Sequence, residues 1–293
     1  MPELPEVETT RRGLTPAMAG KAIFRVVLNR EDLRFPIQAD FKVRVAGRTV
    51  ERIDRRAKYL LLQLSGGDVL VAHLGMSGSF RVESREPAPP TAVLHRKIPR
   101  LKAHDHVVFE MSDGTRVIYN DPRRFGFMFA VASEELDRHP RMRGIGLEPL
   151  EPKIAPAALA RLFNGAGASL KAALLDQKRV AGLGNIYVCE ALHRAGLSPA
   201  RAAATISGPD RHGRDARRRL ADAIVEVLTD AIDAGGSSLR DFSGADGKPG
   251  YFQHSFRVYD REGAACPKRG CAGTIERVIQ AGRSTYYCPV CQR

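Results

Sequence analysis

The residues Lys58–Leu74, which read KYLLLQLSGGDVLVAHL, indicate most directly how this chain folds. Two apolar runs, Lys58–Leu64 and Val69–Leu74, have the length of strands, and Ser65–Asp68 between them has the composition of a hairpin turn. Short strands joined by tight turns favour an antiparallel sandwich or barrel over a parallel sheet. The stretch therefore predicts an antiparallel β-domain.

Outward from this hairpin, the first half of the chain continues in strands. A second turn, Ser112–Gly114, lies among further apolar runs, and the pattern predicts strands at 22–28, 107–111, 116–119 and 127–131. The segment 86–102 is rich in proline and basic residues and is expected to be an exposed loop.

A short helix is expected before the first strand, at Pro5–Arg12. Acidic residues occupy its first turn and arginines its last turn, which is the order that the helix dipole favours. Gly13 follows and is expected to end the helix.

The second half of the chain is predicted to be helical. Proline content rises around Glu148–Pro156, where we place a domain boundary, and beyond it apolar residues recur at helical spacing. We interpret Ser169–Ala195 as two helices joined by two turns, a hairpin that binds nucleic acid and whose second helix opens with backbone amides suited to a phosphate. The segment 239–250 is expected to be a mobile loop. The predicted helices are 157–163, 169–176, 186–195 and 214–234.

Composition indicates a polyanionic partner. The chain has 293 residues, a formal charge of +13 and a pI near 9.9, and clustered lysines and arginines gain binding free energy by displacing counterions from phosphates. No apolar run approaches the roughly 20 residues that cross a bilayer. The N-terminus is acidic and contains proline, unlike a signal peptide. We therefore expect a cytoplasmic protein that does not bind membranes.

Four of the five cysteines form a predicted metal site near the C-terminus. Their spacings allow thiolates to close a tetrahedral zinc site, and the 16 residues between the two pairs suit a β-hairpin. Because no coordination position stays open, the zinc is expected to be structural, with disulfides as the alternative. Arg283 lies on the presumed hairpin, where a guanidinium suits a phosphate. The cysteines are Cys266, Cys271, Cys288 and Cys291.

The N-terminus carries the clearest candidate for catalysis. A small residue such as Pro2 behind Met1 permits removal of Met1, which leaves a secondary amine. An α-amino group has a pKa near 7.7–8, so roughly a tenth or more is unprotonated near neutral pH and can attack a sugar aldehyde carbon. The resulting iminium ion stays positively charged, because the proline nitrogen has no further proton to lose, and elimination becomes easier. The alternative is that Pro2 and Pro5 only shape the entry to a helix.

Two glycine-bounded motifs each follow a predicted strand. His73–Gly78 (HLGMSG) and Asp121–Gly126 (DPRRFG) present bulky side chains between glycines, namely Met76, Arg123 and Phe125. In DNA-handling proteins such side chains fill the gap left when a base leaves the stack, and an arginine bonds to the widowed partner. The alternative is that each of them packs in the core or in a turn.

With these residues assembled, the chain resembles the bacterial formamidopyrimidine-DNA glycosylases, bifunctional enzymes that remove oxidised purines. The resemblance covers nearly the whole chain, through the segments 1–6, 55–59, 73–77, 121–126, 184–186 and 246–251 and the terminal cysteines. It implies an α+β fold with an N-terminal antiparallel β-sandwich flanked by helices (1–148), a helical domain with a helix-two-turn-helix (149–257) that contains a lesion-recognition loop (236–251), and a zinc finger (258–293).

The resemblance also implies roles for individual residues. Pro2 matches the nucleophile, Glu3 the general acid, and Lys58 an essential lysine on the strand facing the damaged nucleotide. Glu6 and Glu190 match supporting acidic residues. The side chains that fill the void match Met76, Arg123 and Phe125. The positions that grip the backbone around the lesion match His73, Lys171, Asn185, Tyr251 and Arg283, although Lys171 on its own reads equally as a solvated lysine.

The implied reaction is excision of everted 8-oxoguanine or formamidopyrimidine through a proline Schiff base, followed by strand cleavage through β,δ-elimination. The implied substrate is double-stranded DNA with oxidised bases or abasic sites, the implied cofactor is one structural zinc ion, and the enzyme is expected to be a monomer at the nucleoid of a bacterial cytoplasm. In one departure, four residues separate Cys266 from Cys271, whereas the family usually has two.

Two other functions compete with this interpretation. An enzyme that resembles endonuclease VIII shares the amine but prefers oxidised pyrimidines, and its relatives usually begin Met-Pro-Glu-Gly-Pro-Glu and lack the arrangement of Arg123 and Phe125. A non-enzymatic zinc-finger protein that binds DNA would not need Pro2, Glu3 and Lys58 together.

Overall fold

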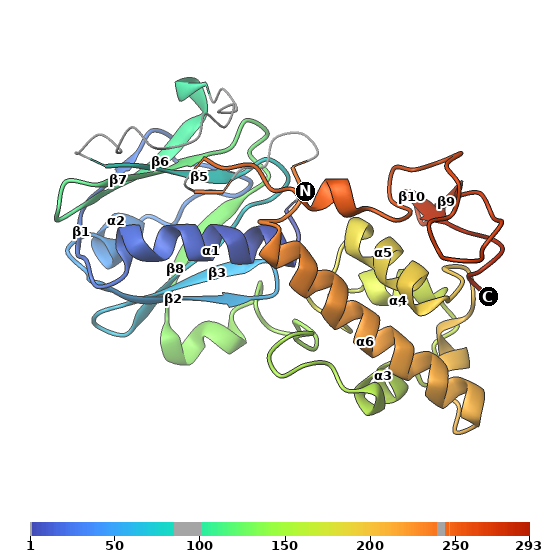
Figure 1. Cartoon of the computed structure of the whole chain (residues 1–293). Coiled ribbons are helices and arrows are strands. Elements are labelled where there is room, and N and C mark those ends of the chain that lie inside the picture. Colours follow the sequence, from blue (N-terminus) through green and yellow to red (C-terminus); the bar gives the residue numbers. More distant parts are fainter. Residues whose placement is uncertain (1, 85–100, 239–243, 246) are drawn as a thin grey trace. The chain divides into compact units, whose positions relative to one another are not determined.

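The computed structural model describes residues 2–84, 101–238, 244–245 and 247–293, and it divides into two compact units (Figure 1). One unit comprises residues 1–143 and 234–251, and the other comprises residues 144–233 and 252–293. Residues 86–100 of the loop predicted at 86–102, and residues 239–243 and 246 of the loop predicted at 239–250, lie outside the described residues.

The first unit is a sandwich of two antiparallel four-stranded sheets, which confirms the predicted fold class. In the hairpin of residues 58–74, the leucines at the alternate positions 60, 62 and 64 enter the core shared by the two sheets. One sheet has the order β2-β3-β4-β8, with strands Val50–Arg56, Tyr59–Leu64, Asp68–His73 and Phe127–Ala132. The other has the order β1-β6-β7-β5, with strands Ile23–Leu28, Asp105–Met111, Arg116–Asn120 and Ser79–Glu83.

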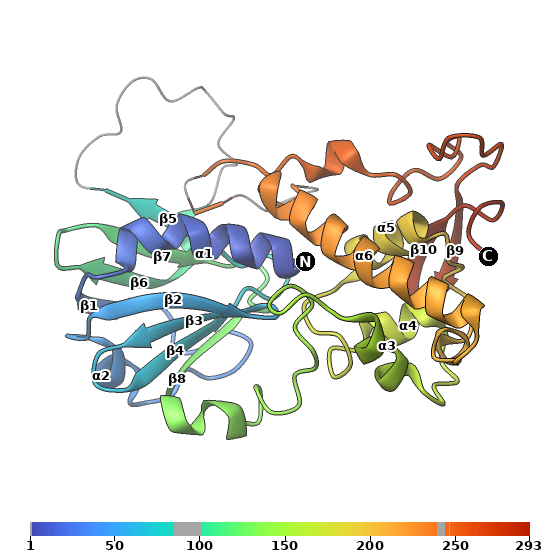
Figure 2. The ribbon, with the colours of Figure 1, turned by 60° about the horizontal axis from the view of Figure 1, so that its bottom comes forward.

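Two helices close the open sides of the sandwich. Helix α1 (Leu4–Met18) packs against β2, β3 and β5, and so covers the side between the edge strands β2 and β5 (Figure 2). Helix α2 (Phe41–Val45) packs against β1 and β8, the edge strands of the opposite side. Both helices bury apolar side chains in the core that the sheets share.

The prediction that Gly13 ends the first helix was wrong, because α1 continues to Met18. Leu14 and Met18 are fully buried, and their burial stabilises the extra turns despite the glycine. A Cβ at Gly13 would lie 3.1 Å from the Cβ of Ala245, so this glycine permits close packing of the helix rather than ending it.

Six strands were located from the sequence to within about two residues, whereas β2 and β5 were missed. Strand β2 is an edge strand with only Val50 and Ile53 buried, and its charged residues hide the apolar alternation. The lysine at 58 was placed on a strand, but β3 begins at Tyr59. Residues 57 and 58 form the two-residue loop that joins the paired residues Arg56 and Tyr59.

The second unit holds four α-helices and a two-stranded sheet among the described residues, and it contains the predicted helix-two-turn-helix. In the turns between α4 and α5, the side chain of Gln177 donates to the Leu183 carbonyl and accepts from the Gly182 amide. The helices are α3 (Pro156–Phe163), α4 (Leu170–Leu175), α5 (Asn185–Ala195) and α6 (Arg211–Asp233), and the hairpin strands are β9 (Glu276–Gln280) and β10 (Arg283–Tyr287).

Four short 3-10 helices complete the described secondary structure. They are η1 (Lys102–His104), η2 (Ser133–Arg138), η3 (Ala203–Ile206) and η4 (Phe252–Ser255). Within the described residues, none of the helices combines the length and the apolar character of a membrane span.

Candidate active site and zinc centre

The start of α1 is fixed by two glutamates. Glu3 is the residue that precedes the helix, and the Glu6 carboxylate accepts hydrogen bonds from the Glu3 amide and the Ser237 amide, both at 2.8 Å. Glu3 and Glu6 are 3% and 2% exposed, and Pro2 is buried. The main chain around Pro2 and Glu3 is therefore held in one orientation by Glu6.

Helix α1 directs its N-terminus toward the β2–β3 hairpin. The Arg55 guanidinium lies 3.3 Å from the Glu8 carboxylate, and Arg11 donates to the Ile53 carbonyl at 3.2 Å, so α1 runs antiparallel to β2. Residues before Glu8 consequently extend toward the hairpin loop that carries Lys58, which is 7% exposed. Burial pushes the pKa of Glu8 upward, but hydrogen bonds from neighbouring arginines outweigh this effect and lower the pKa overall.

His73 ends β4 at the same end of the sheet, paired with Tyr59 on one side and Phe127 on the other. Its ring stacks on Phe127 with 5.0 Å between centroids. Burial, together with the charges of Lys58 and Arg34, lowers the pKa of His73 to about 4. Its Nδ1 accepts a hydrogen bond from the Gly75 amide at 3.0 Å. The imidazole is therefore neutral near pH 7 and carries its proton on Nε2, which suits donation to a phosphate oxygen.

A buried aspartate joins the two glycine-bounded motifs. Asp121 is fully buried, and its carboxylate accepts from the Ser77 hydroxyl at 2.6 Å, the Gly126 amide at 2.8 Å and the Tyr119 hydroxyl at 3.1 Å. The Ser77 hydroxyl in turn accepts from the Arg123 amide at 3.1 Å. No role for Asp121 was predicted from the sequence, because an aspartate after a strand is usually exposed in a turn.

The glycines of these motifs allow the two loops to touch. A Cβ at Gly75 would lie 2.2 Å from the carbonyl carbon of Phe125, and a Cβ at Gly126 would lie 1.8 Å from the Tyr119 hydroxyl oxygen. No side chain fits at either position, so glycine is required for this close approach.

The joined loops present the three predicted side chains together. Met76 and Phe125 are 38% and 40% exposed, although large apolar side chains usually avoid water, and the Arg123 guanidinium carbon lies 4.9 Å from the centre of the Phe125 ring. All three line a cleft of about 530 Å³ whose wall also includes Arg34 and His73. The combination of apolar surface and cationic groups suits a base stack and its phosphates.

In the second unit, Glu190 binds main-chain amides. It is fully buried, and its carboxylate accepts hydrogen bonds of 2.8–3.1 Å from the amides of Arg257, Val258 and Tyr259. Glu190 thus holds the segment that leads into the cysteine-bearing module.

Lys171 and Asn185 contact the β9–β10 hairpin. The Lys171 ammonium donates to the Ser284 carbonyl at 3.0 Å and to the Thr285 hydroxyl at 2.6 Å, and Asn185 donates to the same Ser284 carbonyl at 2.9 Å. Lys171 is 1% exposed, and burial lowers its pKa. Both side chains therefore fix the backbone next to Arg283, which is exposed at the start of β10.

Tyr251 lies at the end of the first unit. Its amide donates to the Ala234 carbonyl at 2.9 Å, and its side chain is 47% exposed. This hydrogen bond holds the main chain at Tyr251, the last residue of the segment 236–251 that was predicted to be the lesion-recognition loop.

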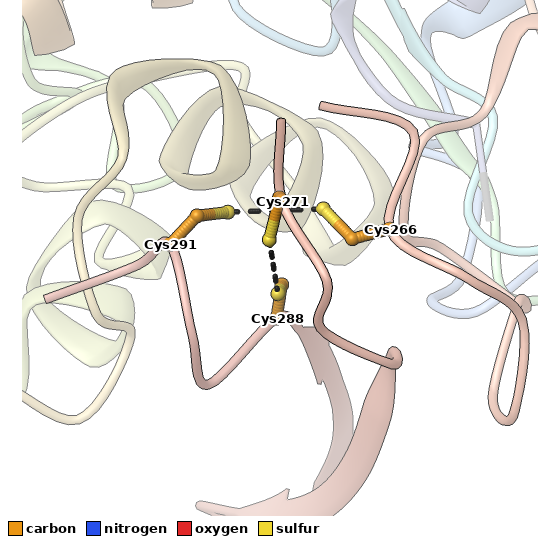
Figure 3. Close-up of side chains that lie close together, drawn as sticks. All are labelled: Cys266, Cys271, Cys288 and Cys291. Carbon is orange, nitrogen blue, oxygen red and sulfur yellow. Dashed lines mark hydrogen bonds between the residues drawn. The ribbon is translucent and has the colours of Figure 1, made fainter. Parts of the chain in front are cut away.

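The four C-terminal cysteines converge on one point (Figure 3). Their sulfur atoms all lie within 4.8 Å of one another, with 3.8 Å between Cys266 and Cys291 and 3.6 Å between Cys271 and Cys288. A tetrahedron of thiolates about 2.3 Å from zinc has edges of about 3.8 Å, so the geometry fits this metal. The cysteines bind one structural zinc ion, which confirms the prediction, and the longer first spacing is accommodated by the exposed turn 267–270.

Comparison with known proteins matches this chain over nearly its full length. Residues 1–128 match the formamidopyrimidine-DNA glycosylase N-terminal domain, residues 145–243 match the formamidopyrimidine-DNA glycosylase H2TH domain, and residues 265–293 match the zinc finger found in FPG and IleRS. The formamidopyrimidine-DNA glycosylases of Beijerinckia indica and Mesorhizobium japonicum are 57% and 56% identical, and each alignment covers 100% of both chains.

Solved structures agree with these sequence matches. The MutM (Fpg) protein from Thermus thermophilus has a TM-score of 0.81 at 41% identity, covering 99% of this chain and 98% of that one. The Lactococcus lactis Fpg bound to DNA containing an abasic site has a TM-score of 0.83 at 31% identity, covering 99% of each chain. A Lactococcus lactis Fpg mutant bound to Fapy-dG-containing DNA has a TM-score of 0.84 at 32% identity, covering 100% of both chains.

Proposed function

The chain belongs to the formamidopyrimidine-DNA glycosylase family, and from this premise we propose that it excises oxidised purines with Pro2 as its nucleophile. It is a DNA glycosylase of base excision repair, and damaged DNA is its partner. The alternatives, an enzyme like endonuclease VIII and a non-enzymatic DNA-binding protein, are not favoured by the matches over the full chain.

The chemistry begins at the amine of Pro2 once Met1 is removed. The nitrogen lone pair attacks C1′ of the damaged nucleotide, and the glycosidic bond breaks with its electron pair going to the base. The nitrogen gives up its N–H proton, and the departing base takes up one proton, so the step balances. The C1′–O4′ bond then opens, and the iminium forms as O4′ accepts a proton. Glu3 is the proposed proton donor, because its buried carboxyl adjoins the nucleophile.

The iminium then makes strand cleavage possible. It draws electrons from C2′, so a C2′ proton is lost and the C3′–O3′ bond breaks, releasing the 3′ phosphate. Loss of a C4′ proton and cleavage of the C5′–O5′ bond release the 5′ phosphate. Lys58 is proposed to bind a phosphate of the damaged nucleotide.

One observation carries the proposal. Pro2 precedes the buried Glu3 at the start of a helix that points toward Lys58 and His73 at one end of the sheet. The positive end of the α1 dipole disfavours a protonated amine at Pro2, which favours the nucleophilic form.

The remaining site residues are proposed to bind and deform the DNA. Met76, Arg123 and Phe125 would fill the space of the everted nucleotide, with Arg123 bonding to the opposite base. Phosphate contacts are proposed for His73, Asn185, Tyr251 and Arg283. Lys171 is proposed to support DNA binding through the hairpin that it holds, and Glu190 through the segment that it anchors.

Three further expectations stay predictions. They are the domain boundaries 1–148, 149–257 and 258–293, the segment 236–251 as the loop that closes over the everted base, and a monomeric enzyme that works at the nucleoid in the bacterial cytoplasm. The two compact units of the structure divide the chain differently, because the segment 234–251 belongs to the unit of the sandwich.

Covalent trapping tests the nucleophile. Borohydride added during turnover reduces the iminium, so peptide mapping should find the DNA adduct on Pro2. A short N-terminal extension that prevents exposure of the amine should abolish trapping, whereas the same extension at the C-terminus should leave it unchanged. An adduct mapped to Lys58 would overturn the assignment.

A second experiment tests Glu3. The Glu3→Gln variant keeps the shape of the side chain but cannot donate a carboxyl proton, so base excision should fall by about 10²-fold or more. Cleavage at a preformed abasic site should be largely retained, because that sugar already interconverts with the open aldehyde. Equal losses on both substrates would show that Glu3 only caps the helix.

A further inference from the structure

Helix α5 presents two side chains to the zinc cysteines. Cys189 and His193 lie one helical turn apart on α5, and both are 1% exposed. Cys189 belongs to the same buried cluster as Cys266 and Cys288. The Nε2 atom of His193 lies 3.4 Å from the sulfur of Cys266, within hydrogen-bonding distance for sulfur.

The zinc-bound state decides the direction of this hydrogen bond. A zinc ligand is a thiolate and has no proton, so Nε2 of His193 must be the donor and the Cys266 sulfur the acceptor. Nδ1 of His193 is buried and has no hydrogen-bond partner among the described residues. A neutral imidazole protonated on Nε2 leaves only an acceptor unmatched at Nδ1, whereas the other tautomer would bury a donor without a partner.

We propose that His193 is a positioning residue of the zinc centre, which donates a hydrogen bond from Nε2 to the Cys266 thiolate and so ties α5 to the metal. Such a bond withdraws charge from the sulfur, which makes the thiolate a poorer target for protons and electrophiles. Groups that hydrogen-bond to metal ligands typically change metal affinity by about 10–100-fold when they are removed.

The residues that follow α5 contact the end of the same module. The Arg293 amide donates to the Gly196 carbonyl at 3.2 Å, and the Gln292 side chain donates to the Leu197 carbonyl at 3.0 Å. Gln292 also accepts from the Cys288 amide at 2.8 Å. The zinc ligands are thus connected to the C-terminal end of α5 at several points, with His193 as the direct link to a ligand sulfur.

This connection gives the zinc ion an effect at the other end of the helix. Asn185 begins α5 and holds the Ser284 carbonyl next to Arg283. When the bond from His193 is present, the zinc site and the start of α5 are parts of one hydrogen-bonded structure. Weakening this hydrogen bond is therefore expected to make the β9–β10 hairpin less ordered and to lower the affinity for zinc.

The experiment compares zinc loss from the full-length wild type with that from three variants. His193→Phe fills the space without a donor, His193→Gln restores an N–H group, and Cys189→Ala removes packing against the cysteines while the bond from His193 to Cys266 stays in place. Zinc release into excess chelator is followed with a zinc-binding dye, and folding is checked by circular dichroism. We expect His193→Phe to release zinc about 10–100-fold faster, His193→Gln to lie between it and the wild type, and Cys189→Ala to differ little.

A spectroscopic measurement separates the hydrogen bond from packing. In cobalt-substituted protein, the thiolate-to-cobalt charge-transfer band should shift in His193→Phe and return toward its wild-type position in His193→Gln. If His193→Phe does not fold, His193→Leu replaces it. The proposal would be overturned if His193→Phe, or His193→Leu in its place, released zinc at the wild-type rate and had the wild-type cobalt spectrum. It would also be overturned if Cys189→Ala accelerated zinc release as much as His193→Phe does.

Discussion

Replacing Asp121 by asparagine should loosen the two loops that carry Met76, Arg123 and Phe125. The Asp121 carboxylate accepts three hydrogen bonds, from Ser77, Tyr119 and Gly126, and has no donor of its own. An amide keeps one oxygen, which can serve Gly126 and Tyr119, but its NH2 group then faces the Ser77 hydroxyl. That hydroxyl already accepts from the Arg123 amide, so its own proton loses its acceptor.

The magnitude follows from these bonds. Hydrogen bonds to a charged group contribute about 1.5–3 kcal/mol each, so loss of the Ser77 bond and weakening of the other two destabilise the loops by about 3–5 kcal/mol. The neutral amide avoids part of the several kcal/mol that desolvating a carboxylate costs, and this returns about 1–3 kcal/mol. The net local destabilisation is about 2 kcal/mol, which corresponds to roughly 30-fold more frequent opening.

Hydrogen exchange measures this opening directly. The amides of Arg123 and Gly126 should exchange roughly 30-fold faster in Asp121→Asn. The matched control is Asp113→Asn, because Asp113 accepts from the Thr115 amide and pairs with Lys21, but its side chain is 40% exposed. The control should change the free energy of local opening, as measured by hydrogen exchange, by less than about 1 kcal/mol. Wild-type exchange at residues 123–126 in Asp121→Asn would refute the role given to the carboxylate.

Four other outcomes are expected. Arg123→Ala should lose about 1–3 kcal/mol of discrimination between bases opposite the lesion, and unchanged ratios in excision assays would exclude the contact. Lys171→Met should weaken DNA binding without reducing its salt dependence, whereas a lysine bound directly to phosphate would reduce the slope of log K against log salt by about 0.9. The pKa of His73 is lowered to about 4 in the folded protein, so between about pH 6.5 and pH 4 the unfolded chain binds more protons than the folded one. The free energy of unfolding should therefore fall as the pH drops through this range. An NMR titration that places the pKa of His73 near 6.5 would contradict this. Stripping zinc should unfold the residues around the four cysteines and lower DNA affinity, while circular dichroism should show that the β-sandwich is retained.

The sequence by itself determined the elements whose signals are local. The two apolar runs and the glycine turn of Lys58–Leu74 predicted a hairpin, because strand length and turn geometry depend on neighbours in the chain. The four cysteines predicted zinc for the same reason, since ligand type and spacing suffice to close a tetrahedron. The order of the motifs along the chain also sufficed to indicate the family.

Only the tertiary structure decided features that depend on contacts between distant residues. Gly13 resembled a helix stop until the packing of Ala245 and the burial of Met18 were known. The aspartate at 121 had the pattern of an exposed turn residue, and the Ser77 hydroxyl that donates to its buried carboxylate lies 44 residues earlier in the sequence. His193 is separated from Cys266 by more than 70 residues, so no local periodicity could have predicted that its imidazole meets a zinc ligand. Burial and hydrogen-bond partners of this kind are properties of the packed chain, because they exist only after remote segments have come together.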